Sequence, residues 1–288
     1  MTDFHSIWSD LQGVPFEQGY FDAGGVRTRY LHAGSPDKPP LVLLHGTGGH
    51  AEAYVRNLAA HAEFFSTWAI DLVGHGYTQR VGHPLEIADY AQHLIDSLKA
   101  IGVPRAHVSG ESLGGWVAAR VAIDHPELID RLVLNTAGGS QADPQVMERI
   151  RTLSMAAAEH PDWETVKARI LWLMADKSGN YDDIIAARQR IYQQSGFIRS
   201  MEDIVVLQDP VIRGRNILTA DDYARIDAPT LVMWTTHDPT ATVAEGRRIA
   251  SMISGARFLV MEDCGHWPQY EDPETFNKAH TEFLRGLL

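Results

Sequence analysis

One five-residue pattern constrains this chain more than any other feature: Gly110-Glu111-Ser112-Leu113-Gly114. It follows a short apolar run and precedes an alanine-rich segment with helical character. A serine between two glycines at such a junction is typical of a tight strand-to-helix turn that exposes the serine oxygen at its tip. The glycines are needed because the turn is strained and the helix passes close to neighbouring strands. We therefore expect a strand, a sharp turn and a helix around Ser112.

The rest of the chain predicts an α/β fold with a mostly parallel, twisted sheet flanked by helices. Short apolar runs alternate with helical segments, which is the pattern of such a sheet. The expected strands lie at 41–44, 68–71, 106–109, 132–134, 231–234 and 258–261.

Between residues 140 and 217 the alternation stops, and the sequence predicts helices at 144–158, 162–175 and 181–194. We expect an α/β core of residues 1–139 and 218–288, with 140–217 as an inserted helical lid over the chemical site. A second packing layer without a function is the alternative.

Composition limits the classes of partner. With 288 residues the chain can bury a large core, and its net charge of −12 disfavours nucleic acids and anionic membranes, which are both polyanions. The single cysteine, Cys264, excludes an intrachain disulfide, and its place at a strand end predicts a buried, inert thiol. The first residues lack the pattern of a signal peptide, and no apolar run approaches the roughly 20 residues of a membrane span. From the missing signal-peptide and membrane patterns we expect a cytoplasmic protein. From the net charge we expect it to act on a small molecule and not on a polyanion.

A serine hydroxyl needs a neighbouring base to act as a nucleophile, and that base needs an acid to orient it. In this kind of sheet the order along the chain is serine, acid, histidine, with the last two on loops beyond the strand ends. Asp238 follows the run 231–234, and His266 follows the run 258–261. No carboxylate lies between residues 132 and 141, the other place for the acid. The sequence therefore predicts a catalytic triad of Ser112, Asp238 and His266.

Acyl chemistry also requires backbone N–H donors for the developing oxyanion. Leu113, directly after the nucleophile, supplies one at a helix N-terminus. The glycine-rich loop after residue 44 is expected to supply the other, from Thr47 or Gly48. Metal-site motifs and nucleotide-binding glycine motifs are absent from the sequence, so we expect neither a metal nor a cofactor.

The chain resembles the α/β-hydrolase fold family over nearly its whole length, through His45-Gly46, residues 71–76, the pattern at Ser112 and Gly265-His266. More narrowly, it is similar to the meta-cleavage product hydrolases, the C–C bond hydrolases of bacterial aromatic degradation. That narrower resemblance rests on residues 264–271 (Cys-Gly-His-Trp-Pro-Gln-Tyr-Glu), on Phe276-Asn277 and on residues 182–188 (Asp-Asp-Ile-Ile-Ala-Ala-Arg).

This resemblance implies a 2-hydroxy-6-oxo-hexa-2,4-dienoate substrate, which is ketonised and then cleaved by water beside its 6-oxo group. Ser112 would attack the 6-oxo carbon and His266 would relay protons. The resemblance also implies a dimer or a larger homo-oligomer.

Three further residues are predicted to bind the substrate. Arg188 lies on a helix among Ile184, Ile185, Ile191 and Tyr192, where an arginine is unexpected. It would hold the substrate carboxylate, and a side chain that snorkels or forms a buried ion pair is the alternative. Trp267 would neighbour the catalytic histidine or simply pack in the core. Glu111 stands where the family often has asparagine; a carboxylate there could repel a dianionic dienoate or alter proton handling in the cleft, and a side chain that only hydrogen-bonds to the backbone is the alternative.

The loop His45-Gly46-Thr47-Gly48-Gly49-His50 is a second departure from the family, because it lacks the common Gly-Pro-Gly stretch. Two other functions are therefore kept open: a carboxylesterase or lactonase with the same triad, and a non-catalytic ligand receptor of the same fold.

Overall fold

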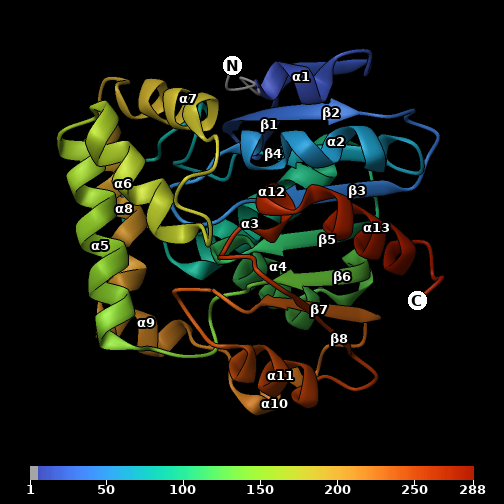
Figure 1. The fold of residues 1–288 in the computed structure, drawn as a ribbon. Helices are drawn as coiled ribbons and strands as arrows, with labels where there is room; N and C mark the ends of the chain where they lie inside the picture. The colour runs from blue at the N-terminus through green and yellow to red at the C-terminus, as the bar shows by residue number, and fades with distance from the viewer. Residues whose placement is uncertain (1–5) are drawn as a thin grey trace.

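The computed structural model describes residues 6–288, and its centre is one eight-stranded sheet in the order β1-β2-β4-β3-β5-β6-β7-β8 (Figure 1). The strands are β1 Phe16–Ala23, β2 Val26–Ala33, β3 Pro40–Leu44, β4 Ser66–Ile70, β5 Ala106–Glu111, β6 Ile129–Asn135, β7 Thr230–Thr235 and β8 Arg257–Met261. Strand β2 runs antiparallel to β1 and to β4, and the neighbours from β4 to β8 pair in parallel. The six predicted strands are all present in this sheet, and the mostly parallel α/β fold is confirmed.

Helices on both sides of the sheet bury it. Those of the core are α1 Ile7–Leu11, α2 Val55–Ala62, α3 Ile87–Ala100, α4 Leu113–Asp124, α10 Ala220–Tyr223, α11 Val243–Met252, α12 Pro268–Glu271 and α13 Pro273–Leu284, with short 3₁₀ turns η1 Ala51–Tyr54 and η2 Pro126–Leu128. The central strand β5 is buried at every position, which is typical of a parallel strand covered on both faces.

A block of helices lies between β6 and β7 in the sequence and projects to one side of the sheet (Figure 1). It comprises α5 Pro144–Glu159, α6 Trp163–Leu173, α7 Asp182–Tyr192, α8 Phe197–Ile204, η3 Val205–Gln208 and α9 Pro210–Asn216. The first three correspond to the predicted helices, whereas α8 and α9 were not predicted as separate elements.

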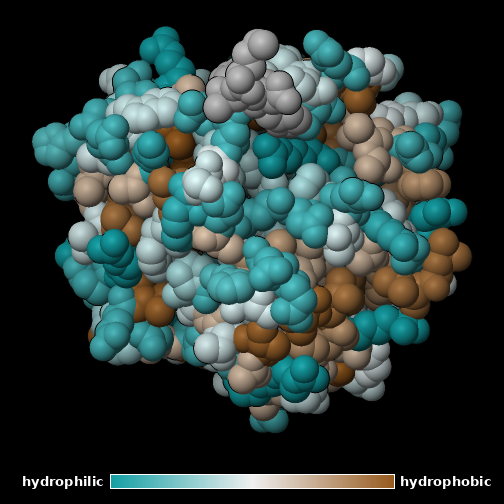
Figure 2. Space-filling model, viewed as in Figure 1, coloured by the Kyte–Doolittle hydropathy of each residue, from teal (hydrophilic) through white to brown (hydrophobic). Residues whose placement is uncertain are grey.

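The hairpin of β1 and β2 was also not predicted. Its strands lie at the edge of the sheet, and β1 has only one buried residue, Ala23, so it lacks the apolar run that marks the central strands. At the opposite edge, β8 is only partly covered, and Figure 2 shows apolar side chains gathered over this side of an otherwise mostly hydrophilic face. Among residues 6–288, no helix is both long and apolar enough to cross a membrane.

The turn at Ser112 has the predicted geometry. Strand β5 ends at Glu111, helix α4 begins at Leu113, and Ser112 between them has φ of 54° and ψ of −114°. A Cβ atom on Gly110 would lie 2.2 Å from the backbone of Gly114, and one on Gly114 would lie 2.3 Å from the carbonyl oxygen of Leu44. Both positions must therefore be glycine, because only a bare backbone allows the helix to approach this closely.

Candidate active site

Asp238 and His266 meet at the carboxyl ends of β7 and β8. The Nδ1 atom of His266 lies 2.9 Å from Oδ1 and 3.0 Å from Oδ2 of Asp238. The Oδ1 atom of Asp238 also accepts hydrogen bonds from the backbone N–H and the hydroxyl of Thr240, each at 2.8 Å. These contacts fix the carboxylate, and the carboxylate in turn orients the imidazole and favours a proton on Nδ1.

The other side of the imidazole faces Glu111 instead of the serine. The Nε2 atom of His266 lies 3.2 Å from Oε1 of Glu111, and Oε2 of Glu111 accepts the backbone N–H of Gly46 at 2.7 Å. Glu111 is 1% exposed. The Ser112 hydroxyl makes no hydrogen bond within residues 6–288, so the structure brings Glu111, which departs from the family pattern, into contact with the predicted base.

Two carboxylates determine the charge of His266. Burial lowers the pKa of His266, but the charges and hydrogen bonds of Asp238 and Glu111 outweigh burial and raise this pKa to about 10. In this arrangement the imidazole is protonated at neutral pH. It can therefore act first as an acid, and it can act as a base only after it has lost this proton.

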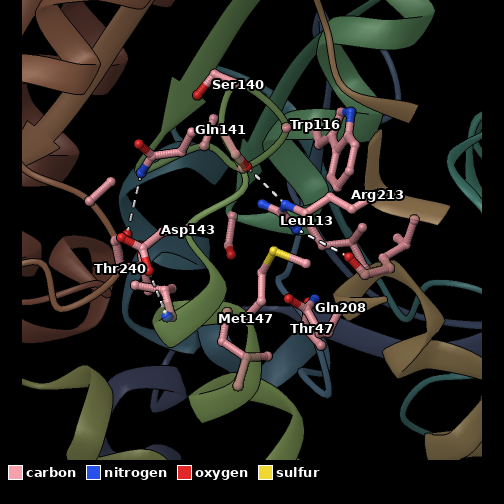
Figure 3. Close-up of a pocket in the computed structure, with 18 of the residues that line it drawn as sticks. Thr47, Leu113, Trp116, Ser140, Gln141, Asp143, Met147, Gln208, Arg213 and Thr240 are labelled. Atoms are coloured by element: carbon pink, nitrogen blue, oxygen red, sulfur yellow. Dashed lines mark hydrogen bonds between the residues drawn. The ribbon is translucent and has the colours of Figure 1, made fainter. Parts of the chain in front are cut away.

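Two of the predicted oxyanion-hole residues line the cavity beside the serine. Leu113 begins α4, and Thr47 lies in the loop after β3; both line the same cavity as Ser112 (Figure 3). Neither amide N–H has an acceptor in the described part of the chain. Gly48, the alternative donor, does not line this cavity, and its carbonyl oxygen accepts a hydrogen bond from the Tyr192 hydroxyl at 2.8 Å.

Arg188 projects from α7 into the interior without a partner. Its side chain is fully buried, and none of its three nitrogens makes a hydrogen bond to any residue that the structure describes. The guanidinium lies 5.0 Å from the centre of the Trp267 ring, which is itself 2% exposed. Burial lowers the pKa of Arg188, and the charge of Glu111 acts in the opposite direction. A cation in this state lacks the hydrogen-bond acceptors that buried charges normally have.

Another buried arginine near Arg188, Arg169 on α6, was missed by sequence reasoning. Arg169 is 3% exposed; its Nε donates to the Ser154 hydroxyl at 3.1 Å, but Nη1 has no partner among the described residues. Burial lowers the pKa of Arg169 to about 10, and the charge of Arg188 acts in the same direction. Arg169 lies on one helix face with Val166, Ile170 and Leu173, so the criterion that selected Arg188 would have found it.

Comparison with known proteins places the chain in a family. The sequence profile of the alpha/beta hydrolase family matches residues 41–279. This chain belongs to the α/β-hydrolase family.

Two relatives are named for the kind of hydrolase that they are. The hydrolase is 30% identical over 281 residues to a 2-hydroxy-6-oxononadienedioate/2-hydroxy-6-oxononatrienedioate hydrolase of Burkholderia vietnamiensis, covering 92% of this chain and 93% of the relative. It is also 30% identical over 281 residues to a 2-hydroxy-6-oxo-6-phenylhexa-2,4-dienoate hydrolase of Comamonas testosteroni, with the same coverage.

Among solved structures, the meta-cleavage product hydrolase of Pseudomonas fluorescens IP01 superposes with a TM-score of 0.82 at 26% identity, covering 94% of this chain and 98% of the other. These comparisons make the chain a hydrolase similar to enzymes of aromatic catabolism.

The cavity of the hydrolase opens from Ser112 toward α5 and α9. Its volume is about 50 Å³, and Arg188 does not line it. Besides Ser112, Leu113 and Thr47, the wall includes Trp116, Met147, Gln208 and Arg213, which Figure 3 shows around the same space. No three His, Cys, Asp or Glu side chains within residues 6–288 are placed to bind one metal ion. Cys264 is buried as predicted, and burial raises the pKa of its thiol to about 12.

Proposed function

We propose that this hydrolase cleaves a carbon–carbon bond in meta-cleavage products of the 2-hydroxy-6-oxo-hexa-2,4-dienoate type, with Ser112, His266 and Asp238 as its catalytic triad. The observation that carries the proposal is the guanidinium of Arg188, which is fully buried and has no hydrogen-bond partner among the described residues. A neutral ester brings no negative charge to such a group, whereas the C1 carboxylate of a dienoate gives it both a charge and two acceptor oxygens.

The charges around Arg188 support the same substrate. Arg188 and Arg169 are both buried cations, and the carboxylates of Asp238 and Glu111 are both in contact with His266. An anionic substrate would compensate the two guanidiniums, because a buried charge without a partner is strongly unfavourable. Trp267 would support the Arg188 guanidinium from its other face.

The raised pKa of His266 suits the first half of the reaction. We propose that the dienoate binds with its C2 oxygen ionised, and that the imidazolium of His266 donates its proton to C5. This proton transfer converts the dienolate to the 2,6-dioxo form and leaves His266 neutral. Glu111 stabilises the imidazolium before the transfer, and Asp238 holds the imidazole in place throughout.

The neutral histidine then serves as the base. It accepts the Ser112 proton while the serine oxygen bonds to C6, and the amide N–H groups of Leu113 and Thr47 bind the resulting oxyanion. The oxyanion returns to a carbonyl as the C5–C6 bond breaks, and the electron pair of that bond passes through C4 and C3 to the C2 oxygen. The C2 oxygen takes the proton from the His266 imidazolium, which gives 2-hydroxypentadienoate. Water then hydrolyses the acyl-serine, so that the second product is a carboxylic acid. The helices of residues 140–217 would act as the lid that keeps bulk water out.

The test compares two substrates. Yellow meta-cleavage products and p-nitrophenyl acetate are incubated with the protein, and kcat/KM is measured for each. The proposal predicts bleaching of at least one dienol with the higher kcat/KM. Ser112→Ala should abolish turnover but still bind the dienol. Rapid ester hydrolysis without bleaching would instead favour a carboxylesterase or lactonase, and ligand binding without any turnover would favour a receptor.

A further inference from the structure

A carboxylate outside the predicted triad, that of Glu111, borders both the predicted base and the serine. Its Oε1 atom lies 3.2 Å from Nε2 of His266, and its Oε2 atom accepts the backbone N–H of Gly46 at 2.7 Å. A Cβ atom on Gly46 would lie 2.6 Å from Oε1 and 2.7 Å from Oε2 of Glu111, and 2.9 Å from Cβ of Ser112. The carboxylate and the serine side chain therefore border the same small space.

The Glu111 carboxylate is held in place by groups other than His266. The residue is 1% exposed, and the hydrogen bond from Gly46 fixes one of its oxygens. Glu111 also interacts electrostatically with the buried guanidiniums of Arg188 and Arg169. Its negative charge therefore remains compensated when His266 loses its proton.

The contact between Glu111 and His266 changes when the imidazole becomes neutral. Asp238 holds a proton on Nδ1, so the lone pair of a neutral His266 is on Nε2. An ionised carboxylate oxygen is likewise only an acceptor. Two buried acceptors that face each other without a proton between them are both left without a donor, which is unfavourable. A group with two donor hydrogens satisfies both.

Water is such a group, and the acyl-serine is the state in which it is needed. Before acylation the Ser112 hydroxyl can donate to Nε2, but after acylation this oxygen belongs to an ester and has no hydrogen. The cavity that Ser112 lines has a volume of about 50 Å³, so a water molecule fits beside the serine. A water that donates to Nε2 and to Oε1 of Glu111 keeps its lone pairs free for the acyl carbon.

We propose that Glu111 positions the water that hydrolyses the acyl-serine. The water oxygen bonds to the acyl carbon while one of its protons passes to Nε2 of His266. The second hydrogen stays on the water oxygen and keeps its bond to Glu111, which gains no proton. The bond between the acyl carbon and the serine oxygen then breaks, His266 returns its proton to Ser112, and the carboxylic acid leaves.

This role rests on the proposed function only for the nucleophile, because esters and dienoates both give an acyl-serine. Glu111→Gln tests it in the hydrolysis of p-nitrophenyl acetate, followed by stopped flow. The burst of p-nitrophenolate measures acylation, and the steady state after it measures deacylation. The deacylation rate constant should fall about 10- to 100-fold, the value of one hydrogen bond to a charged group, while the acylation rate constant stays within a few-fold of native. Acetylated protein should then accumulate, which intact-protein mass spectrometry detects.

The direction of the change separates this role from a purely electrostatic one. Burial lowers the pKa of His266, and Asp238 and Glu111 together raise it. Loss of the Glu111 charge therefore leaves more of the imidazole neutral at neutral pH. If charge were the only role of Glu111, the variant would speed up both steps, because both use the neutral imidazole as the base. Positioning of the water instead predicts slower deacylation alone.

Glu245→Gln is the matched control. Glu245 lies on α11, its side chain is 11% exposed, and its carboxylate contacts Ser140 and Arg248. The substitution removes the same charge from a carboxylate that does not touch His266, so both rate constants should match those of the native protein. Glu111→Asp keeps an acceptor at a shorter reach, so it should retain more of the deacylation rate than Glu111→Gln.

A native deacylation rate constant in Glu111→Gln, or an equal loss in both steps, would overturn this role. If Glu111→Gln does not fold, Glu111→Asp gives the same comparison, with a loss in deacylation that exceeds the loss in acylation. A native protein that the ester never acylates would also overturn it, because no acyl-serine would form. The expected change without any bleaching of dienols would contradict the proposed C–C cleavage and leave the role of Glu111 standing. Bleaching of dienols together with equal losses in both steps would contradict the role of Glu111 and leave the proposed function standing.

Discussion

Arg29 and Arg188 are both buried, at 2% and 0% exposure, yet their surroundings are opposite. Arg29 on β2 forms a bidentate pair with Glu52 at 2.9 and 2.6 Å, and it lies 3.4 Å from Asp71. Burial lowers the pKa of Arg29, but these carboxylates outweigh burial and raise it above its usual range. Arg188 on α7 has no hydrogen bond to any described residue, and its pKa is lowered.

Under the proposed function, the difference separates an arginine whose charge the fold itself compensates from one whose charge a ligand compensates. A buried cation with two carboxylate partners is satisfied by the chain itself, so nothing more is needed to explain Arg29. A buried cation without partners makes folding less favourable, and such a group is expected where function requires it. The following predictions test this distinction.

Arg29→Met should produce the largest effect. It leaves the partly buried carboxylate of Glu52 and the fully buried carboxylate of Asp71 without their cation, so the free energy of unfolding should fall by about 3–5 kcal/mol. Urea denaturation of the variant and the native protein measures the change. A loss below 1 kcal/mol would contradict the structural role of the ion pair between Arg29 and its carboxylates.

Glu111→Gln should change the charge of His266 while keeping the shape of the side chain. The variant loses one of the two carboxylates that raise the pKa of His266, so this pKa should fall. Ester hydrolysis requires the neutral imidazole, so the acidic limb of its kcat/KM profile should move to lower pH. Dienol cleavage requires the imidazolium, and its alkaline limb should move in the same direction. A profile that stays in place for p-nitrophenyl acetate would show that Glu111 does not control the proton on His266.

Arg188→Met should have the smallest effect on the free energy of unfolding, and that effect should be a gain. The substitution removes an uncompensated buried charge, so the variant should be more stable by about 0.5–2 kcal/mol. Urea denaturation without ligand measures it. A loss of stability comparable to that of Arg29→Met would indicate that Arg188 has a structural role after all.

Much of the site was predictable because it depends on local order along the chain. The glycines around Ser112 and the places of Asp238 and His266 after two strands follow from the geometry of a parallel sheet. Arg188 was identified because it interrupts an apolar helix face, and Arg169 satisfies the same criterion but was overlooked.

Contacts between distant segments could not be read from the sequence. The approach of Glu111 to Nε2 of His266 depends on how the loop after β8 packs against the turn after β5. The cavity with Arg213 and Gln208 depends on how η3 and α9 fold back toward Ser112. The edge hairpin of β1 and β2 escaped prediction because its strands are only partly buried and lack a continuous apolar run.

The most direct test of the central claim is the specificity of Arg188→Met, measured as the ratio of kcat/KM for a yellow dienoate to kcat/KM for p-nitrophenyl acetate. If Arg188 binds the C1 carboxylate, the ratio should fall by about 100-fold or more relative to the native protein, because a buried charge pair is lost for the dienoate only. The ester value should stay within a few-fold of native. Equal losses on both substrates would contradict the anchoring role of Arg188, and with it the main support for a dienoate substrate.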